Sequence, residues 1–402
     1  MTLLIILLLM GLALWIAALL WNWYNAKDVE VISAAMEFPL SDHPKVSILI
    51  PARNEADILQ SSLPRFLAQD YDNYEVILVD DDSTDDTKHV ARRLLSQYPD
   101  RLRMLRVEHL PPGWVGKCHA LQVGFQQAQG EWILATDADI LFHPKALRAG
   151  LWIARRQQAE LVSIFSFVEC VSFWEKILLP GFSLMLASIF PVRKINDSRS
   201  TVAIASGGYI LMRRRMWADL GGYEAIRSEM IDDLNTARIV KHSGHRIFAA
   251  PTRNLLSTRM YQDFHEIWEG LRKNAFAGNR YSVAKLLGVV GGICLTNLLP
   301  LAALCYAAAA LMGVGDAAAG EAGRYQLILA LSCAEFLLAA AIHMPMLIYY
   351  RIAVGYAFLA PFAGIIYACI SLDSMFRTLL GHGVSWKLRR YGRPRRERAS
   401  EL

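Results

Sequence analysis

Long apolar runs lie at both ends of the chain, and a stretch of mixed polar and apolar composition lies between them. Residues 3–21 are almost entirely apolar over about the 20 residues that a helix needs to cross a bilayer. Three more apolar stretches lie at 286–313, 326–350 and 353–375. This pattern predicts a membrane anchor at 1–24, a globular domain at 44–285, membrane segments at 286–376 and a tail at 377–402.

Two of the apolar runs allow a second interpretation. Residues 3–21 could be a cleaved signal peptide, but no basic residue precedes the run and no small-residue cleavage site follows it, which favours an uncleaved anchor. Residues 173–192 are apolar, broken by Pro180 and flanked by charged residues. They form either a buried core helix or a helix in the lipid headgroup layer, and we favour the headgroup layer.

Strand-like and helix-like patterns alternate in the first half of the globular region. Strands are predicted at 45–50, 74–79, 102–107 and 132–135. Helices are predicted at 56–67, about 86–97 and 119–129, with Ser83 or Thr84 as the cap of the second. This order predicts an α/β fold in which parallel strands of a Rossmann-like sheet are joined by right-handed crossovers. Ligands of such sheets bind beyond the carboxyl ends of the strands.

Composition and charge bear on the location of the chain. The formal net charge of +5 is too mild to indicate nucleic acid as a partner. Residues 386–398 carry seven Lys or Arg against one Glu, which predicts a basic tail beside cytoplasmic anionic lipid, or equally a solvated tail. The six cysteines show no metal-ligand spacing and indicate a reduced compartment. We therefore expect an integral protein of a bacterial inner membrane with a cytoplasmic catalytic domain.

That orientation requires a particular number of membrane spans, even instead of odd. If the globular domain and the basic tail both lie in the cytoplasm, an even number of membrane spans must separate them. The sequence predicts three apolar stretches there, so one of them is expected to be re-entrant or interfacial.

Two acidic clusters follow predicted strands, at Asp80-Asp81-Asp82 and at Asp137-Ala138-Asp139. Divalent cations prefer oxygen ligands, and Mg²⁺ typically takes one or two carboxylates together with substrate phosphates. A metal held in this way can bridge a diphosphate and stabilise its departure. We predict Mg²⁺ or Mn²⁺ at Asp137 and Asp139, and donor binding at Asp80 and Asp81, with Asp82 left open. A solvated turn with helix-cap chemistry is the alternative for each cluster.

Several of these segments resemble glycosyltransferase family 2. Residues 46–55 (VSILIPARNE) are similar to the opening of that family, and residues 74–87 (YEVILVDDDSTDDT) to its nucleotide-binding segment. Residues 116–139 resemble its Gly-Lys helix and metal motif. With Ser206-Gly207-Gly208 and Asp232-Asp233, the resemblance covers about residues 45–250. Pro111 to Lys117 and Arg259-Met260-Tyr261 are most similar to the hopene-associated and ceramide-glucosyltransferase-like branch.

The resemblance implies a nucleotide-diphospho-sugar transferase fold, a UDP-sugar donor, and Mg²⁺ or Mn²⁺. It implies donor binding at Asp80, Asp81, Glu55, Lys117 and Asp137. It also implies metal binding at Asp139 with Asp137, and Asp233 as the catalytic base.

The sequence departs from the family pattern at three places. Asp82 replaces a usual glycine, and Asp232-Asp233 replaces a usual Glu-Asp pair. The Gln-x-x-Arg-Trp motif of processive synthases is absent, and Arg259, Tyr261 and Lys273 occupy that region. The roles of these three residues are left open. The role of Trp114 is also left open, because it could line the entrance of the donor or acceptor or pack under a loop.

The adjacent carboxylates of Asp232 and Asp233 begin a predicted helical stretch. A helix N-terminus favours the ionised form of a carboxylate, which is the form that a general base needs. Asp233 is expected to activate an acceptor hydroxyl, with Asp232 as the second candidate and a helix cap as the alternative for both.

We expect an inverting, metal-dependent transfer of a sugar from a nucleotide-diphosphate donor to a lipid hydroxyl. A processive polysaccharide synthase would give a ladder of products instead of a single glycolipid. A non-catalytic membrane scaffold of the same fold would bind no UDP-sugar in the presence of metal.

Overall fold

The computed structural model describes residues 1–313, 321–381, 384–386 and 389–391. The chain forms two compact units. The sheet unit contains residues 25–169 and 190–260, and the helical unit contains residues 1–24, 170–189 and those from 261 onward. Residues 261–285, which the sequence analysis included in the globular domain, group with the helical unit. Most of the predicted basic tail lies outside the described residues.

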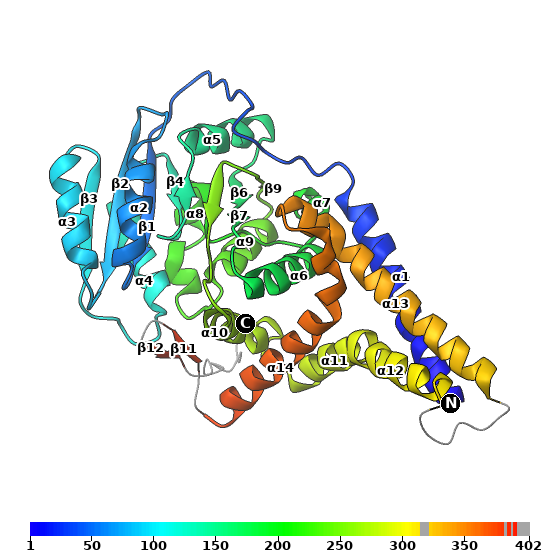
Figure 1. Ribbon diagram of the computed structural model, residues 1–402. Helices are drawn as coiled ribbons and strands as arrows, with labels where there is room; N and C mark the ends of the chain where they lie inside the picture. Colours follow the sequence, from blue (N-terminus) through cyan, green and yellow to red (C-terminus); the bar gives the residue numbers. More distant parts are fainter. Residues whose placement is uncertain (314–320, 382–383, 387–388, 392–402) are drawn as a thin grey trace, which may run out of the picture. The chain divides into compact units, whose positions relative to one another are not determined.

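One mixed sheet forms the centre of the sheet unit, with the strand order β3-β2-β1-β4-β8-β6-β9 (Figure 1). Its strands are β1 (Val46–Ala52), β2 (Tyr74–Asp81), β3 (Leu102–Val107), β4 (Trp132–Ala135), β6 (Leu161–Phe165), β8 (Ile210–Arg213) and β9 (Ile247–Pro251). Strand β8 is antiparallel to both of its neighbours, and the other adjacent pairs are parallel. The predicted mostly parallel sheet is confirmed. Successive strands run from β1 to β3 in one direction and continue on the other side of β1 with β4, so a topological switch point lies between β1 and β4.

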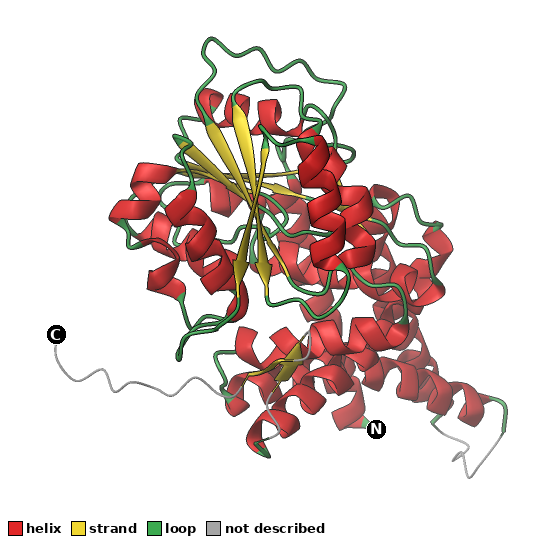
Figure 2. Ribbon diagram, turned by 90° about the vertical axis from the view of Figure 1, so that its left-hand side faces the viewer, coloured by secondary structure: helices red, strands yellow, loops and turns green. Residues whose placement is uncertain are grey.

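Helices cover both faces of this sheet (Figure 2). One face packs against α2 (Ala56–Leu67), α3 (Thr87–Gln97) and α5 (Ala146–Arg156). The other packs against α4 (Gly116–Gln127), α8 (Arg214–Asp219), the short 3₁₀ helix η1 (Gly222–Ile226) and α9 (Asp232–His242). Alternation along β1 explains the two layers, because Ile48 and Ile50 join the first core and Leu49 joins the second. A short helix, α7 (Val192–Asn196), and a small sheet of β5 (Leu141–Phe142), β10 (Leu256–Thr258) and β7 (Phe167–Val168) complete the unit.

The predicted strands and helices of the first half are present, with small shifts at their ends. Strand β2 continues to Asp81, two residues beyond its predicted end, and α4 begins at Gly116 instead of residue 119. The predicted cap of α3 is wrong, because neither Ser83 nor Thr84 caps this helix, which begins at Thr87. Both side chains bond to the loop after β1, a long-range contact that a local pattern does not reveal.

The helical unit contains the long apolar segments. Its elements are α1 (Thr2–Ala26), α6 (Phe173–Ile189), α10 (Phe264–Gly278), α11 (Val283–Ile293), the π-helical turn η2 (Cys294–Leu298), α12 (Leu299–Leu311), α13 (Ala322–Tyr349), η3 (Val354–Leu359), α14 (Ala360–Leu379), β11 (Val384–Trp386) and β12 (Arg389–Tyr391). Within the described residues, five helical segments are long and apolar enough to cross a membrane: Thr2–Ala26, Phe173–Asn196, Val283–Leu311, Ala322–Tyr349 and Val354–Leu379. The expected break at Pro180 is wrong, since α6 continues through it.

A buried lysine fixes the segment that leads from α7 to β8. Lys241, near the end of α9, donates hydrogen bonds to three main-chain carbonyls, those of Lys194 at 3.0 Å, Ile195 at 2.6 Å and Val202 at 2.9 Å. The residue is 8% exposed. Because α9 begins at Asp232 and the segment continues to Gly207, this contact joins two parts of the chain that carry predicted site residues.

Replacing Lys241 with methionine keeps most of the apolar stem but leaves the three carbonyls without their donor. We expect Lys241→Met to lower the free energy of unfolding by about 2–3 kcal/mol, because unpaired buried polar groups are costly. Denaturant unfolding of the purified protein measures this loss. Arg215→Met, at a side chain that is 95% exposed, is the matched control and should change stability by less than about 0.5 kcal/mol. Equal stability of the two variants would contradict the prediction.

Candidate active site

The loops that follow β1 and β2 are joined by short polar side chains. The Asn54 amide donates to Ser83 Oγ at 3.0 Å, and Asn54 Oδ1 accepts from the Thr84 amide at 2.9 Å. The Glu55 amide donates to Thr87 Oγ1 at 2.8 Å. Because β1 and β2 are parallel neighbours, both loops leave the same edge of the sheet, and these bonds hold them in one arrangement.

The aspartates that end β2 are buried. Asp80 is 0% exposed and Asp81 is 4% exposed. Asp80 Oδ1 accepts from the Ser83 amide at 3.0 Å, so this carboxylate closes the turn that follows β2. The Arg53 guanidinium donates to the main-chain carbonyls of Asp81 and Asp82. Asp82 has φ of +56°, a conformation that glycine adopts freely and aspartate tolerates better than most residues. The usual glycine at this position therefore has a backbone explanation.

The second acidic pair follows β4, on the other side of β1. Asp139 Oδ2 accepts from Thr258 Oγ1 at 3.1 Å, which ties it to β10. Burial raises the pKa of Asp139 to about 6, and the neighbouring charges of Asp137 and Glu55 act in the same direction. Thus Glu55 from the β1 loop and Asp137 both lie close enough to Asp139 for their charges to act on it.

Lys117 pairs with two of the predicted acidic residues. It follows Gly116 at the start of α4, and its Nζ lies 2.8 Å from Asp137 Oδ1 and 3.0 Å from Asp232 Oδ2. Burial acts to lower the pKa of Lys117, but the charges of Asp137, Asp232 and Asp233 outweigh it and raise that pKa well above its ordinary value. Lys117 is therefore a fixed positive charge between the loop after β4 and the start of α9.

Asp232 and Asp233 are the first residues of α9, as predicted, and they have different partners. Asp232 pairs with Lys117. Asp233 accepts from two main-chain amides, that of Gly207 at 3.0 Å and that of Leu234 at 2.7 Å. Burial, followed by the charge of Asp232, raises the pKa of Asp233 to about 6, while Lys117 and the amide of Leu234 act to lower it.

These contacts connect most of the predicted site residues. Charge interactions and ion pairs link Glu55, Asp139, Asp137, Lys117, Asp232 and Asp233 at the carboxyl ends of β1 and β4. Asp80 and Asp81 stand at the end of β2, one strand away, where Ala52 pairs with Asp80. Within the described part of the chain, no three His, Cys, Asp or Glu side chains are grouped so as to hold a metal on their own.

The remaining predicted residues fall into both units. Trp114 packs edge-on against His119, with ring centroids 5.3 Å apart, beside the core of the sheet unit. Arg259 also belongs to the sheet unit, whereas Tyr261 and Lys273 belong to the helical unit. There Tyr261 lies against Gly270 of α10, where a Cβ would come within 2.4 Å of its ring.

Two residues that contact the predicted site were not recognised from sequence. Thr258 bonds to Asp139, and Thr136 Oγ1 donates to the Gly208 carbonyl at 2.8 Å. Thr136 directly precedes the Asp-Ala-Asp motif and Thr258 lies outside the quoted segments, and a hydroxyl at a strand end is too common to predict such a contact. Gly207 was named only as part of the family resemblance, and its bond to Asp233 was not predicted.

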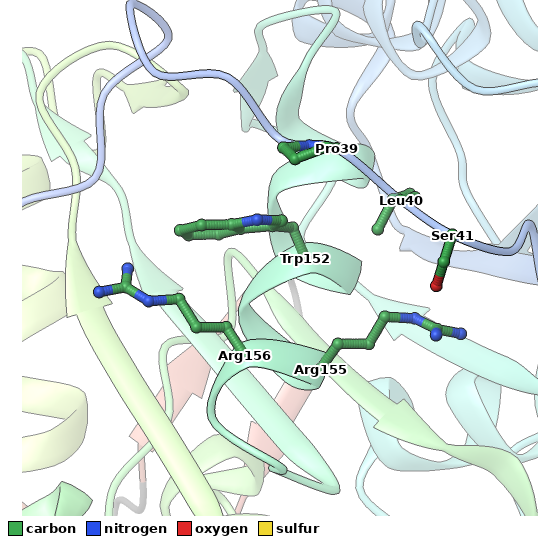
Figure 3. A pocket seen from close by; sticks show the side chains of 6 residues that line it. All are labelled: Pro39, Leu40, Ser41, Trp152, Arg155 and Arg156. Carbon is green, nitrogen blue, oxygen red and sulfur yellow. The ribbon is translucent and has the colours of Figure 1, made fainter.

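A pocket of about 540 Å³ lies elsewhere on the sheet unit, lined by Pro39, Leu40, Ser41, Trp152, Arg155 and Arg156 (Figure 3). Arg155 pairs with Asp42, and Arg156 pairs with Glu30 at 2.6 Å. The helix residues belong to the last turns of α5, directly before β6, which runs in the same direction as β1 and β4. The pocket therefore lies at the amino ends of the strands, at the opposite edge from the acidic residues.

Comparisons with known proteins bear on the fold and on the family. A mannosyltransferase from Pyrobaculum calidifontis, solved in complex with GDP-Man and Mn²⁺, has a similar structure, with a TM-score of 0.56 and 20% identity over 92% of this chain and 99% of that one. A beta-monoglucosyldiacylglycerol synthase from Nostoc is 32% identical over 145 residues, which are 35% of this chain. A dolichol-phosphate mannosyltransferase from Pyrococcus furiosus is 30% identical over 178 residues, which are 43% of this chain. The chain spans 30% and 47% of the lengths of these two relatives.

The sheet unit has the nucleotide-sugar transferase fold, with a mixed and mostly parallel sheet, as the sequence predicted. Residues 47–221 match the family described as glycosyl transferase family 2. This match over part of the chain, together with the similar glycosyltransferases, supports a glycosyltransferase enzyme.

The contacts of Lys117 predict a pH-dependent effect on stability. At pH 8 Asp233 is ionised and Lys117→Met removes a neutralising charge beside it, whereas at pH 5, below its pKa of about 6, most Asp233 carries a proton. We expect this variant to lower the free energy of unfolding by about 2 kcal/mol at pH 8 and by less at pH 5, since the pair is part-buried. Unfolding measured at both pH values, with Lys88→Met on α3 as control, tests this. A loss of the same size at both pH values would refute it.

Proposed function

We propose that this protein transfers a single sugar from a nucleotide-diphosphate donor, a UDP-sugar, to the hydroxyl of a membrane lipid. The observation that carries the proposal is the group of carboxylates around Lys117 at the switch point between β1 and β4. In open α/β sheets, ligands bind in the crevice at such a point. Buried carboxylates are costly unless cations offset their charge, so a cluster of them beside one lysine favours a cation-binding role over a structural one.

Each acidic residue has a proposed role in donor binding. Asp80 and Asp81 at the end of β2, with Glu55, hold the nucleoside. Lys117 and Asp137 are proposed to bind the diphosphate, whose charge the positive charge of Lys117 would partly neutralise. The mannosyltransferase of similar fold, which was solved with GDP-Man, supports a nucleotide-sugar as the class of donor.

The residues after β4 fit a divalent cation. Asp139 is partly buried, and its pKa is raised by desolvation and by the charges of Asp137 and Glu55, a situation that a bound cation relieves. Magnesium-type sites need only one or two carboxylates when substrate phosphates and water supply the other ligands, so the absence of a larger cluster among the described residues is compatible with this role. Asp139 and Asp137 would hold Mg²⁺ or Mn²⁺, which when bound stabilises the charge of the departing nucleotide.

Asp233 is proposed as the base. Its carboxylate is oriented by the amides of Gly207 and Leu234, and a pKa of about 6 leaves it ionised near neutral pH. An ionised carboxylate in this position can take the proton of the acceptor hydroxyl as that oxygen attacks the anomeric carbon. Direct attack of this kind inverts the configuration of the sugar.

The acceptor is proposed to be a lipid alcohol, and the sheet unit is proposed to face the cytoplasm. The five segments suited to crossing a membrane that are found in the described part of the chain support an acceptor that lies in the bilayer. So do the names of two relatives, one a glucosyldiacylglycerol synthase and the other a dolichol-phosphate mannosyltransferase. A hopanoid or a sphingolipid-like alcohol is the acceptor that the branch resemblance suggests.

Asp233→Asn should lower kcat about a hundredfold to ten-thousandfold, because the amide cannot accept the proton, while donor binding changes little. For the wild-type protein, kcat/KM should rise with pH through about 6 as Asp233 becomes ionised, and level off above it. Release of nucleotide in the presence of native membrane lipids measures both. Asp219→Asn, at a side chain that is 72% exposed on α8, is the control. Full turnover by Asp233→Asn would remove Asp233 from this role.

Asp139→Asn should weaken donor binding that depends on Mn²⁺. For the wild-type protein, calorimetry should detect UDP-sugar binding with Mn²⁺ and at least about tenfold weaker binding with a chelator. The variant should bind equally weakly under both conditions. A parallel titration with GDP-sugars tests the choice of nucleotide, and product analysis by mass spectrometry distinguishes one added sugar from a polymer. If the wild-type protein binds the donor equally well with Mn²⁺ and with a chelator, the proposed metal site is contradicted.

A further inference from the structure

Contacts from separate elements meet at Gly207, in the turn that precedes β8. Its amide donates to Asp233 Oδ2 at 3.0 Å, and its carbonyl accepts from the Asp137 amide at 3.1 Å. The Cα of Gly207 faces the ion pair of Asp137 and Lys117. A single backbone residue thus touches the proposed base, the loop after β4 and the lysine of α4.

The space beside this Cα is filled by charged atoms. A Cβ at Gly207 would lie 2.8 Å from Asp137 Oδ2 and 3.1 Å from Lys117 Nζ. Both distances are shorter than the usual contact of a methyl group with such atoms, about 3.5 Å. Any side chain at position 207 therefore requires the ion pair or the backbone to move.

The backbone of the turn is held in place from the other side. The Ser206 amide donates to Ser163 Oγ at 2.8 Å, and the Tyr209 amide donates to the Ser206 carbonyl at 2.9 Å. A Cβ at Gly208 would lie 2.8 Å from Ser166 Oγ and 2.9 Å from Ile140 Cδ1, so the turn is closely packed there too. Because the turn cannot retreat, the strain of a side chain at position 207 falls on Lys117 and Asp137.

We propose that Gly207 is a positioning residue for the active site: its missing side chain leaves the room in which Lys117 pairs with Asp137, and its amide orients Asp233. The catalytic meaning of this inference rests on the function proposed above, whereas the effect on the ion pair does not. Gly207→Ala keeps the main-chain amide that donates to Asp233. We therefore expect this variant to weaken donor binding more than it lowers the activity of Asp233 as a base.

The first test follows Lys117 itself and needs no activity. A lysine whose amine is held in ion pairs reacts slowly with an acylating reagent, because the reagent must reach that amine. We expect Gly207→Ala to raise the acetylation rate of Lys117 about threefold or more, measured by mass spectrometry against the exposed Lys285 in the same sample. Gly208→Ala is the matched control, because its Cβ meets uncharged core atoms, and it should leave the Lys117 rate unchanged.

The second test separates donor binding from turnover. Gly207→Ala should raise the KM for the nucleotide-sugar about tenfold and change kcat much less. In a double-mutant cycle, Gly207→Ala should add little further loss of donor binding to Lys117→Met, because the lysine is then absent. If Gly207 had only a general structural role, the losses of donor affinity caused by Gly207→Ala and Lys117→Met would be independent and would multiply. In that case kcat would also fall about as much as donor affinity.

The outcomes decide separately on the inference and on the function. The inference is overturned if Gly207→Ala folds and the acetylation rate of Lys117 is unchanged. It is also overturned if the losses of donor binding in the double-mutant cycle multiply. If Gly207→Ala fails to fold, a folded Lys117→Met/Gly207→Ala protein supports the inference, and a double variant that also fails to fold overturns it. A wild-type protein that neither binds nor transfers a sugar refutes the proposed function, while the Lys117 rates still test Gly207.

Discussion

Several carboxylates lie close together near one edge of the sheet, and this arrangement requires a positive charge among them. Asp137, Asp139, Asp232 and Asp233 come from two separate parts of the chain, and burial of ionised carboxylates close together is unfavourable unless positive charge lies among them. Lys117 supplies such charge, since it contacts Asp137 and Asp232 and its own pKa is raised in return. The pKa values of Asp139 and Asp233 are nevertheless raised, first by burial and then by the charges of neighbouring carboxylates. A site with unbalanced negative charge is suited to a ligand that arrives with a cation.

The strand order explains how these residues come together. The chain builds β1, β2 and β3 on one side and then returns to place β4 on the other side of β1, so the loops after β1 and β4 flank the switch point. Strand β8 then enters antiparallel beside β4, which brings the turn at Gly207 against Asp137. Helix α9 begins at the same edge, and Lys241 anchors its far end to the segment that leads to this turn. The site is therefore assembled from elements whose own positions are fixed by the sheet.

Periodicity and motifs were enough to predict the parallel strands, the helices between them and the acidic residues at their ends. These features are local: two of the β-rich runs are followed by aspartates, and the first three runs are followed by helical patterns. The partners of those residues could not be predicted. Thr258 bonds to Asp139 across 119 residues of sequence, and Ser83 was interpreted as a helix cap although it bonds to the loop after β1. Nothing in a local pattern distinguishes a hydroxyl that caps its own helix from one that bonds across two strands. The continuity of α6 through Pro180 was missed for a related reason, because tertiary packing outweighs the local cost of proline.

The different partners of the two adjacent aspartates argue for different roles. Asp232 is committed to Lys117, and moving a proton onto its carboxylate would break that ion pair. Asp233 receives main-chain amides instead, which orient both of its oxygens without neutralising the charge. Burial and the charge of Asp232 disfavour the ionised form of Asp233, so its affinity for a proton is greater than that of an ordinary aspartate. A base benefits from this combination, because it stays ionised near neutral pH and still accepts a proton more readily than an exposed carboxylate. The pairing pattern thus supports Asp233 over Asp232 as the residue that activates the acceptor.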